Sequence, residues 1–370
     1  MVVGAGIGGL AAALSLRRAG WDVRVVEQAA SPRELGFALA LAPNALAALD
    51  ELGLRDLVMS RGVEVKSFEV RRPDGRAVKR VVLHGAAMQS IVLLRSALHG
   101  TLLEAVGSDA LLLGRRVAGL TTLPVSADVI IGADGVGSTI RRALHPDETP
   151  PRASGYHAVR GVSEVGGDAL GDTDFAVYLG DGIEIGLAKA SRTAIYWYIS
   201  LVDEFAGADA PGMLDRCTHG LDDRAVAIIR AAPAASVRHD QLFTRAPLAR
   251  LGDGNVTLLG DAAHPVLPHT AQGAALALED AVALGLVLRH GGDPVAALRR
   301  YEDARAPRTR RVIGAGPRIA ALTTTRKRSR IVLRQAGIRL VPGAVVSWAL
   351  NSHARDPHRE LRKSPSRTRV

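Results

Sequence analysis

Two separated segments decide the fold of this chain: Gly4-Ala5-Gly6-Ile7-Gly8-Gly9 near the start and Gly260-Asp261-Ala262-Ala263-His264-Pro265 about two-thirds of the way along. The first segment follows Met1-Val2-Val3, which is typical of the end of a buried parallel strand, and precedes a helix predicted over Leu10 to Ala19. Glycines in such a turn let the backbone approach a pyrophosphate, to which the helix N-terminus presents unpaired N–H groups.

A second predicted strand, Trp21 to Glu27, ends in an acid at the spacing of about 20 residues that brings it to the ribose hydroxyls of a dinucleotide. An acid there favours a free 2′-hydroxyl, so the resident nucleotide is NAD or FAD rather than NADP. A strand-to-helix turn without a ligand is the alternative for the glycines alone. The residues predicted to bind the dinucleotide in this part of the chain are Gly4, Gly6, Gly8, Gly9, Glu27 and Gln28.

The second half of the chain repeats the pattern of strand and glycine-rich turn. Asp128 to Ile131 is an apolar strand that runs into Gly132-Ala133-Asp134-Gly135. Asn255 to Leu259 is another, and it would deliver Gly260 and Asp261 to the carboxyl edge of the sheet, where open α/β sheets bind ligands. Pro268 to Gly273 then leads into a predicted helix, Ala274 to Leu288, whose N-terminus would favour a negatively charged ring or phosphate.

Between residues 151 and 250 the pattern changes to short strands with alternating apolar positions, which predicts an antiparallel sheet. The aromatic residues Tyr178, Tyr196, Trp197 and Tyr198 gather here, and packing within the sheet is favoured for them over contact with a substrate. Arg160 and His239 could anchor a carboxylate or phenolate, or could be charges at the rim of the sheet.

With these motifs in order, the chain resembles the class A flavoprotein monooxygenases, the p-hydroxybenzoate hydroxylase family, in particular its salicylate hydroxylase-like and 3-hydroxybenzoate 6-hydroxylase-like branches. The resemblance covers nearly the whole chain. It implies an α/β fold, with a Rossmann-like FAD-binding domain, an inserted antiparallel β-sheet substrate domain and C-terminal helices. The FAD-binding domain would comprise residues 1–150 and 251–320, the substrate domain 151–250, and a helical segment with a basic tail 321–370.

The resemblance also implies a role for each motif. The first glycine turn and Glu27 would hold the ADP half of FAD, and Asp134-Gly135 would serve both FAD and a passing nicotinamide cofactor. Gly260 and Asp261 would meet the ribityl chain. The residues implied beside the isoalloxazine ring are Pro268, Gln272, Gly273 and Ala274. Arg95 matches an arginine that contacts the phosphate or ribityl region, and Pro43-Asn44-Ala45 matches a segment close to the flavin. No residue is assigned a catalytic role, and His264 is interpreted as a local hydrogen-bonding residue.

The family reaction implies FAD as cofactor and NADH or NADPH as a transient electron donor. O₂ would then hydroxylate or epoxidise a small aromatic or polyketide-like substrate through a flavin C4a-hydroperoxide, in a pocket that keeps water out. Two alternatives remain. One is a related flavoenzyme such as a reductase or a halogenase, although Tyr196 to Ser200 lacks the second Trp and the Pro of the halogenase segment Trp-x-Trp-x-Ile-Pro. The other is an FAD-binding paralogue with weak or no monooxygenase activity.

Three departures from the family pattern keep that second alternative open. Only Thr121 to Ala127 lie where the family has a β-hairpin near the adenine end of FAD. The loss of this hairpin would loosen FAD or expose the edge of a sheet. Ala271 stands where the family commonly has glycine, and Ala275 stands where many members have asparagine.

Composition narrows the remaining classes. The chain of 370 residues is 47% hydrophobic, enough for a large core, and its single cysteine, Cys217, excludes an intramolecular disulfide. No metal-ligand spacing and no targeting segment is evident, so we expect a cytoplasmic enzyme without a metal, either a monomer or a homodimer. The net charge is +10, and residues 301–370 hold 17 Lys+Arg against 4 Asp+Glu. A solvated basic surface is the favoured interpretation, contact with an anionic membrane surface is the minority one, and no nucleic-acid partner is expected.

Overall fold

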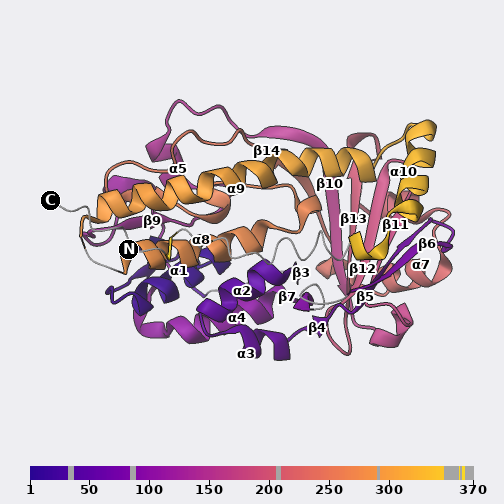
Figure 1. Ribbon diagram of the computed structural model, residues 1–370, viewed down its shortest axis with the longest axis horizontal. Coiled ribbons are helices and arrows are strands. Elements are labelled where there is room, and N and C mark those ends of the chain that lie inside the picture. Colours follow the sequence, from indigo (N-terminus) through magenta and orange to yellow (C-terminus); the bar gives the residue numbers. More distant parts are fainter. Residues whose placement is uncertain are drawn as a thin grey trace.

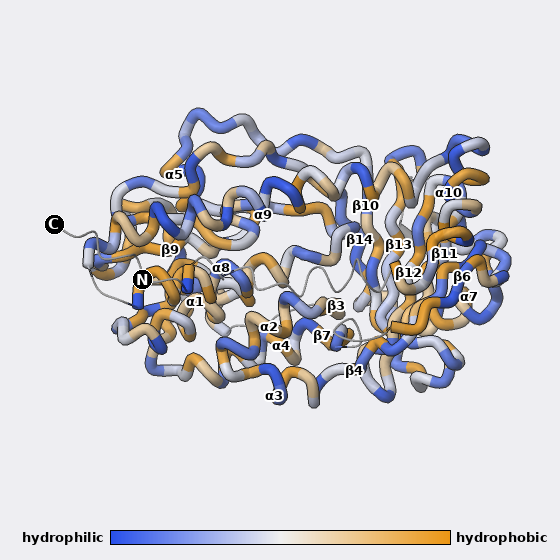
Figure 2. Tube along the Cα trace, viewed as in Figure 1, coloured by the Kyte–Doolittle hydropathy of each residue, from blue (hydrophilic) through white to orange (hydrophobic). Residues whose placement is uncertain are grey.

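The computed structural model describes three sheets and the helices that connect them (Figure 1). The described residues are 1–31, 37–83, 89–205, 210–289, 292–345, 358, 361 and 362. Figure 2 shows hydrophobic stretches in both halves of the molecule, one around β9 and another around β11. Of the segment 321–370, which was predicted to be helical with a basic tail, residues 346–357, 359, 360 and 363–370 lie outside the described residues.

A five-stranded parallel sheet forms the centre of the half that contains the N-terminus. Its strands, in spatial order, are β15 (Val256–Leu258), β9 (Ile130–Gly132), β1 (Val2–Val3), β2 (Val25–Val26) and β8 (Leu111–Leu112). All neighbouring strands pair in parallel. The carboxyl ends of β1, β2, β9 and β15 therefore lie along one edge, as the Rossmann-like prediction requires. β8 is the edge strand of this sheet, opposite β15. Residues 113–129, all of which are described, form no strand.

Helices cover this parallel sheet. They are α1 (Ile7–Arg18), α2 (Pro43–Glu51), α3 (Arg55–Ser60), α4 (Arg95–Val106), α5 (Thr139–Leu144) and α8 (Gly273–Leu288). α1 begins at Ile7, three residues before the predicted Leu10, and its first turn includes Gly8 and Gly9. α8 packs tightly on α1, since a Cβ on Gly285 would lie 2.1 Å from the Ser15 hydroxyl oxygen.

A seven-stranded sheet forms the other half of the molecule. Its strands, in spatial order, are β14 (Arg238–Thr244), β10 (Arg152–Ser163), β13 (Ile195–Val202), β12 (Ile183–Lys189), β11 (Phe175–Leu179), β5 (Ser67–Arg71) and β6 (Ala77–Val82). The strands between residues 151 and 250 pair antiparallel, as predicted. β5 and β6 come from the first 150 residues, and β5 joins β11 in parallel. This long-range pairing was not predicted, because the pattern of a strand does not reveal its partner.

The two faces of this sheet have different neighbours. One face packs with α6 (Ala210–Thr218) and α7 (Asp223–Arg230) around a core that includes Trp197, Ile199 and Cys217. Toward the other face lies a small sheet of β3 (Ala38–Leu41), β7 (Ile91–Leu94) and β4 (Val63–Glu64). The long helix α9 (Pro294–Thr323) runs between the two halves and is followed by α10 (Arg328–Leu340), as Figure 1 shows.

Candidate flavin and substrate sites

A cavity of about 550 Å³ opens at the carboxyl edge of the parallel sheet. The predicted residues that line it are Gly4, Gly6, Glu27, Gln28, Asp134 and Gly135. They reach this cavity because β1, β2 and β9 are adjacent and each ends here. The first glycine turn, Glu27 and the Asp134 motif are thus brought together in one site.

Close packing, as well as ligand access, explains the glycines of the first turn. Gly4 has a φ of +105°, and a Cβ on it would lie 2.4 Å from the Ala133 carbonyl oxygen. A Cβ on Gly9 would lie 1.9 Å from the Gly4 carbonyl oxygen, and one on Gly8 would lie 2.7 Å from a methyl carbon of Leu259. The turn can therefore fold against β9 and β15 only without side chains at these positions. Gly6 is the N-cap of α1, so the N-terminus of this helix points toward the cavity.

Glu27 joins the glycine turn to the segment after β2. Its two carboxylate oxygens accept hydrogen bonds from the Ala5 and Ala29 backbone N–H groups, each at 2.8 Å. A carboxylate has about four acceptor positions, so both oxygens retain capacity for ribose hydroxyls. Glu27 is thus oriented by the backbone toward the cavity that it lines.

Asp134 has a structural role that the motif did not predict. Its Oδ2 accepts hydrogen bonds from the Thr139 N–H at 2.6 Å, the Thr139 hydroxyl at 2.9 Å and the Ile140 N–H at 3.3 Å, which holds the start of α5. Its Oδ1 is buried and has no hydrogen-bond partner among the described residues. Because Asp134 lines the cavity, this oxygen is the kind of group that a bound ligand would satisfy.

Four basic residues of the cavity were not predicted. They are His99, Arg115, Arg116 and Arg142. His99 Nε2 donates to the Ala5 carbonyl oxygen at 2.7 Å and so supports the glycine turn from α4. The three arginines balance Glu27 and Asp134 and make the cavity suitable for a pyrophosphate. Only a cluster such as Arg115-Arg116 after a short strand could have indicated them in the sequence.

The second motif lies beside the first at the same edge of the sheet. β15 pairs with β9, and the Leu259 N–H donates to the Gly132 carbonyl oxygen at 2.9 Å. Asp261 follows directly, in the 3₁₀ turn Gly260–Ala262. Its side chain is accessible to solvent, but surrounding protein raises the pKa of its carboxyl, while His264 and Arg95 oppose that rise. The sheet thus places Asp261 two strands away from the glycine turn, with β9 between them.

A buried ionic network supports this motif from behind. The Gly260 N–H and His264 Nε2 donate to Asp280 Oδ2 at 3.1 and 2.5 Å, which confirms His264 as a local hydrogen-bonding residue. Arg305 donates to Asp280 Oδ1 at 2.6 Å and to Glu279 Oε2 at 2.8 Å. Burial would raise the pKa values of both acids, but His264 and Arg305 hold that of Asp280 far below its usual range. Arg305 and Arg308 likewise lower the pKa of Glu279.

The same network reaches the turn that precedes α8. Asn44 Nδ2, at the start of α2, donates to Glu279 Oε1 at 2.7 Å and to Gln272 Oε1 at 3.0 Å. Gln272 is thereby fixed next to Gly273, the first residue of α8. Ala271 has a φ of +49°, the one positive value at a non-glycine position among the described residues. Two acids within the otherwise apolar run Ala274 to Leu288 were the signal in the sequence for this network, because buried acids need partners.

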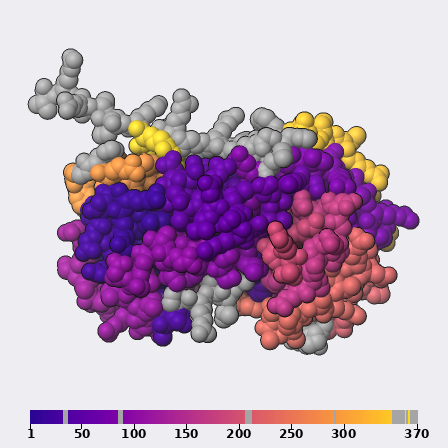
Figure 3. Space-filling model, turned by 90° about the horizontal axis from the view of Figure 1, so that it is seen from below, coloured from indigo at the N-terminus to yellow at the C-terminus, as the bar shows by residue number. Residues whose placement is uncertain are grey.

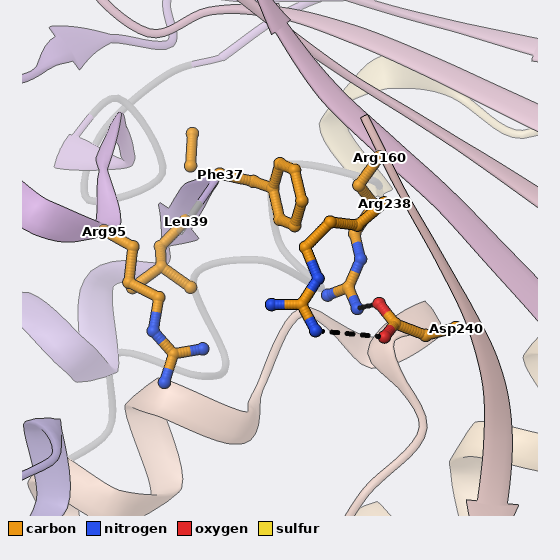
Figure 4. Close-up of a pocket in the computed structure, with 7 residues that line it drawn as sticks. Phe37, Leu39, Arg95, Arg160, Arg238 and Asp240 are labelled. Atoms are coloured by element: carbon orange, nitrogen blue, oxygen red, sulfur yellow. Dashed lines mark hydrogen bonds and ion pairs between the residues drawn. The ribbon is translucent and has the colours of Figure 1, made fainter. Parts of the chain in front are cut away.

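A smaller cavity of about 140 Å³ lies between the two halves of the molecule (Figure 4). Arg95, the first residue of α4, lines one side of it, and Arg160, Arg238 and Asp240 from β10 and β14 line the other. Asp240 forms ion pairs with Arg160 and, at 3.7 Å, with Arg238. The Arg160 guanidinium also lies 5.2 Å from the centre of the Phe37 ring. One acid faces two arginines of the sheet, so this side of the cavity is net positive.

The other residues of the sheet that the sequence analysis singled out divide between its two faces. Tyr178 and Trp197 are buried in the packed core, as predicted for sheet packing. Tyr196 lies on the cavity side, 6.4 Å from Phe37 between ring centres, and burial raises its pKa to about 12 against a smaller opposing effect of Arg160. Tyr198 donates to Glu184 at 2.6 Å. His239 is directed away from the cavity and bonds His157 at 2.7 Å, which separates it from Arg160.

A parallel sheet whose edge carries a glycine turn, an acid at the end of β2 and an arginine-rich cavity defines a dinucleotide-binding protein. The chain matches the sequence profile of a family described as "FAD binding domain" over residues 1–117 and 115–315. The chain belongs to this family, and it is an FAD-dependent monooxygenase.

Individual relatives agree with this assignment. The chain is 33% identical over 344 residues to a 3-amino-4-hydroxybenzoate 2-monooxygenase of Streptomyces cremeus, with 86% of each chain covered. It is 32% identical to 3-hydroxybenzoate 6-hydroxylase 1 of Aquipseudomonas alcaligenes, with 84% of this chain and 86% of the relative covered. In fold it is similar to Klebsiella pneumoniae HpxO complexed with FAD and uric acid, with a TM-score of 0.88, 24% identity, and coverage of 95% and 96% of the two chains.

Proposed function

We propose that this enzyme uses NADH or NADPH and O₂ to hydroxylate a small aromatic molecule that carries an anionic substituent. The observation that supports this best is the position of Arg95. It lines the small cavity and also influences the pKa of Asp261, so the flavin motif and the arginine-lined cavity adjoin each other. Two of the relatives are named for hydroxybenzoate substrates, which combine an aromatic ring with a carboxylate.

The residues at the sheet edge fit FAD, and we propose a role for each group. The N-terminus of α1 and the glycine turn would bind the pyrophosphate, and Glu27 with Gln28 would bind the adenosine ribose. Gly260, Asp261 and Arg95 would hold the ribityl and phosphate region. The residues that we place beside the ring are Pro268, Gln272, Gly273 and Ala274. Bound FAD would supply electron transfer from the nicotinamide cofactor and the activation of O₂. Residues 1–150 without β5 and β6, together with 251–320, would then form the FAD-binding unit, and 151–250 with β5 and β6 the substrate unit.

The residues of the small cavity would orient the substrate. Arg160 and Arg238 present more positive charge than Asp240 neutralises, so a carboxylate or phenolate would bind on this side. Phe37 and Tyr196 would contact the ring and exclude water from it. Because the ion pair with Asp240 holds Arg160 in place, the anion would meet a guanidinium that is already oriented.

A spectral titration tests this proposal. The purified protein should carry FAD and be yellow, and hydroxybenzoates should perturb the flavin absorption band and stimulate oxidation of NADH or NADPH. Methyl esters of the same acids are the matched control, because they keep the ring and lose the charge. Equal binding of acids and esters would contradict the anionic substituent, and failure to retain any FAD would contradict the whole proposal.

A second candidate is an FAD-binding paralogue with little monooxygenase activity. The specific observation is that residues 113–129 form no strand, so that β8 ends the parallel sheet near the Glu27 end of the larger cavity. In that case the protein would bind FAD, and none of the hydroxybenzoates tested would accelerate NADH or NADPH oxidation. The same titration therefore separates the two candidates.

A further inference from the structure

Helix α10 is attached to the body of the protein by one face only. Arg334 is its buried residue. The Arg334 guanidinium donates to the carbonyl oxygens of Leu179 and Gly180, at 3.3 and 3.1 Å, at the end of β11. It also donates to the Thr323 carbonyl oxygen at 2.5 Å, at the end of α9. These bonds fix which side of α10 is turned toward solvent.

The side turned toward solvent is apolar. Val332, Leu333 and Leu340 are 67%, 72% and 81% exposed. At about 100° per residue they fall within one sector of the helix roughly 100° wide, which we call the α10 apolar strip. Val341 and Val345, directly after the helix, are also exposed. Single exposed apolar residues are ordinary, but a helix that turns its apolar sector outward indicates an interaction surface.

Arginines border the α10 apolar strip on both sides. Arg328 and Arg339 lie along one side of it and Arg330 along the other, and all three are exposed. None of the three forms an ion pair within the described part of the chain. α10 contains no acidic residue, and residues 301–370 as a whole carry 17 Lys+Arg against 4 Asp+Glu.

We propose that α10 is a docking helix for the surface of an anionic lipid bilayer. The α10 apolar strip would enter the boundary between headgroups and acyl chains, and the three bordering arginines would contact anionic headgroups. An amphipathic helix with an apolar sector between basic residues has the composition that binds such surfaces. Among the described residues no helix is long and apolar enough to cross a bilayer, so the contact would be peripheral.

Charge favours a lipid surface over a second copy of this chain. In a symmetric pair, each strip would face its counterpart, and Arg328, Arg330 and Arg339 would be brought near the same three arginines. An anionic bilayer instead satisfies both the apolar sector and its basic border. Figure 3 shows the C-terminal helical region, in yellow, on the outer surface of the molecule. In Figure 1, α10 lies at the end of the molecule that contains the seven-stranded sheet, opposite the end where α1 and β9 are labelled.

Vesicle co-sedimentation of the full chain loaded with FAD tests the proposal. The probes are phosphatidylglycerol–phosphatidylcholine vesicles and pure phosphatidylcholine vesicles, at low and moderate salt. One triple variant, Val332→Ser, Leu333→Ser and Leu340→Ser, removes the apolar strip and keeps every charge. A second, Arg328→Gln, Arg330→Gln and Arg339→Gln, removes the basic border. The matched controls are Leu57→Ser, an exposed leucine on α3, and the exposed arginine set Arg192→Gln, Arg310→Gln and Arg311→Gln.

We expect the wild-type protein to bind anionic vesicles and not neutral ones, and each triple variant to lose about 100-fold in partitioning. Partitioning of Leu57→Ser should fall by less than about threefold. The control triple variant of arginines outside α10 should lose less partitioning than the variant of the basic border. Absence of wild-type binding would overturn the proposal. So would binding that survives loss of the apolar strip, because it would come from charge elsewhere. A strip-dependent dimer without vesicle binding would also overturn it, in favour of self-association.

Discussion

The two cavities of this enzyme are built in different ways. The larger one is built around a backbone turn at the end of a parallel strand, where Gly4 and Gly9 leave no room for side chains, and charged side chains form its other walls. The smaller one is formed by the side chains of Phe37, Arg160 and Arg238, which come from three distant segments. A backbone-built site tolerates almost no change, whereas a site built of side chains can be altered one contact at a time. Under the proposed function, the first site would bind the cofactor, which stays constant, and the second would select the substrate.

The sharpest way to break this comparison is to add one carbon to the backbone-built site. A Cβ on Gly9 would lie 1.9 Å from the Gly4 carbonyl oxygen, so we expect Gly9→Ala to abolish FAD binding and to lower the free energy of unfolding by more than about 3 kcal/mol. Urea unfolding and flavin absorbance measure both effects.

Gly100→Ala is the matched control, because a Cβ there would meet no atom within 4 Å and Gly100 lies within α4. This change should stabilise the protein by about 0.5 to 1 kcal/mol and leave FAD bound. Retained FAD in Gly9→Ala would show that the turn is not packed as described.

The next largest effect should come from the buried network behind the flavin motif. Asp280→Asn removes one of the two buried carboxylates that pair with Arg305. We expect the free energy of unfolding to fall by about 3 to 5 kcal/mol at neutral pH. Asp303 is the control, because it is exposed on α9, the helix that carries Arg305. Asp303→Asn should change the free energy of unfolding by less than about 0.5 kcal/mol.

The network also predicts a direction of pH dependence. The pKa values of Asp280 and Glu279 are lower in the folded protein than in the unfolded chain. Their contribution to the free energy of unfolding is therefore fully present above the unfolded pKa values near 4. It is lost progressively as the pH falls toward the lower folded values. Unfolding midpoints between pH 7 and pH 3 should therefore fall less steeply in Asp280→Asn than in the wild type. Equal pH dependence would contradict the network.

The sequence was informative where the physical cause is local. The glycine turn, Glu27, and the Gly260-Asp261 motif each follow a strand directly, so their position at the sheet edge could be predicted. Arg305 lies 25 residues after Asp280, and nothing in a linear pattern indicates that α9 returns over α8. The pairing of β5 with β11 was missed for the same reason, since it joins residues 107 positions apart such as Phe68 and Phe175. For the small cavity, the sequence left Arg160 open between an anchor for an anion and a charge at the rim of the sheet. Arg238 and Phe37 were not considered, because their position depends on register between segments.

Two smaller effects, opposite to each other in sign, are expected on ligand affinity in the cavity that is built of side chains. Arg238→Gln removes one positive charge, and we expect the Kd for a hydroxybenzoate to rise about tenfold. Asp240→Asn removes the acid between the two arginines, and the Kd should fall several-fold. Neither change should alter FAD affinity. Ligand titration of the flavin band measures both, and changes in the same direction would contradict the proposed anion site.

The smallest effect should come from Ala271, the one non-glycine residue with a positive φ among those that the structure describes. Ala271 has a φ of +49°, a region that costs an L-residue about 1 kcal/mol. Ala271→Gly should therefore stabilise the protein slightly, by up to about 0.5 kcal/mol after the greater freedom of glycine in the unfolded chain is included. The exposed helical Ala296→Gly on α9 should instead destabilise by about 1 kcal/mol. Thermal unfolding of the two variants side by side shows the difference in sign.

The most direct test of the account compares FAD affinity in two single variants of the apoprotein, by quenching of flavin fluorescence. Asp261→Ala removes the proposed contact to the ribityl chain, and Arg238→Gln changes only the substrate side of the small cavity. The account predicts that Asp261→Ala weakens FAD binding by about 10- to 100-fold, which is about 1.4 to 2.8 kcal/mol. It predicts that Arg238→Gln leaves FAD binding unchanged. Unchanged affinity in Asp261→Ala, or a loss of the same size in Arg238→Gln, would contradict the separation of the two sites.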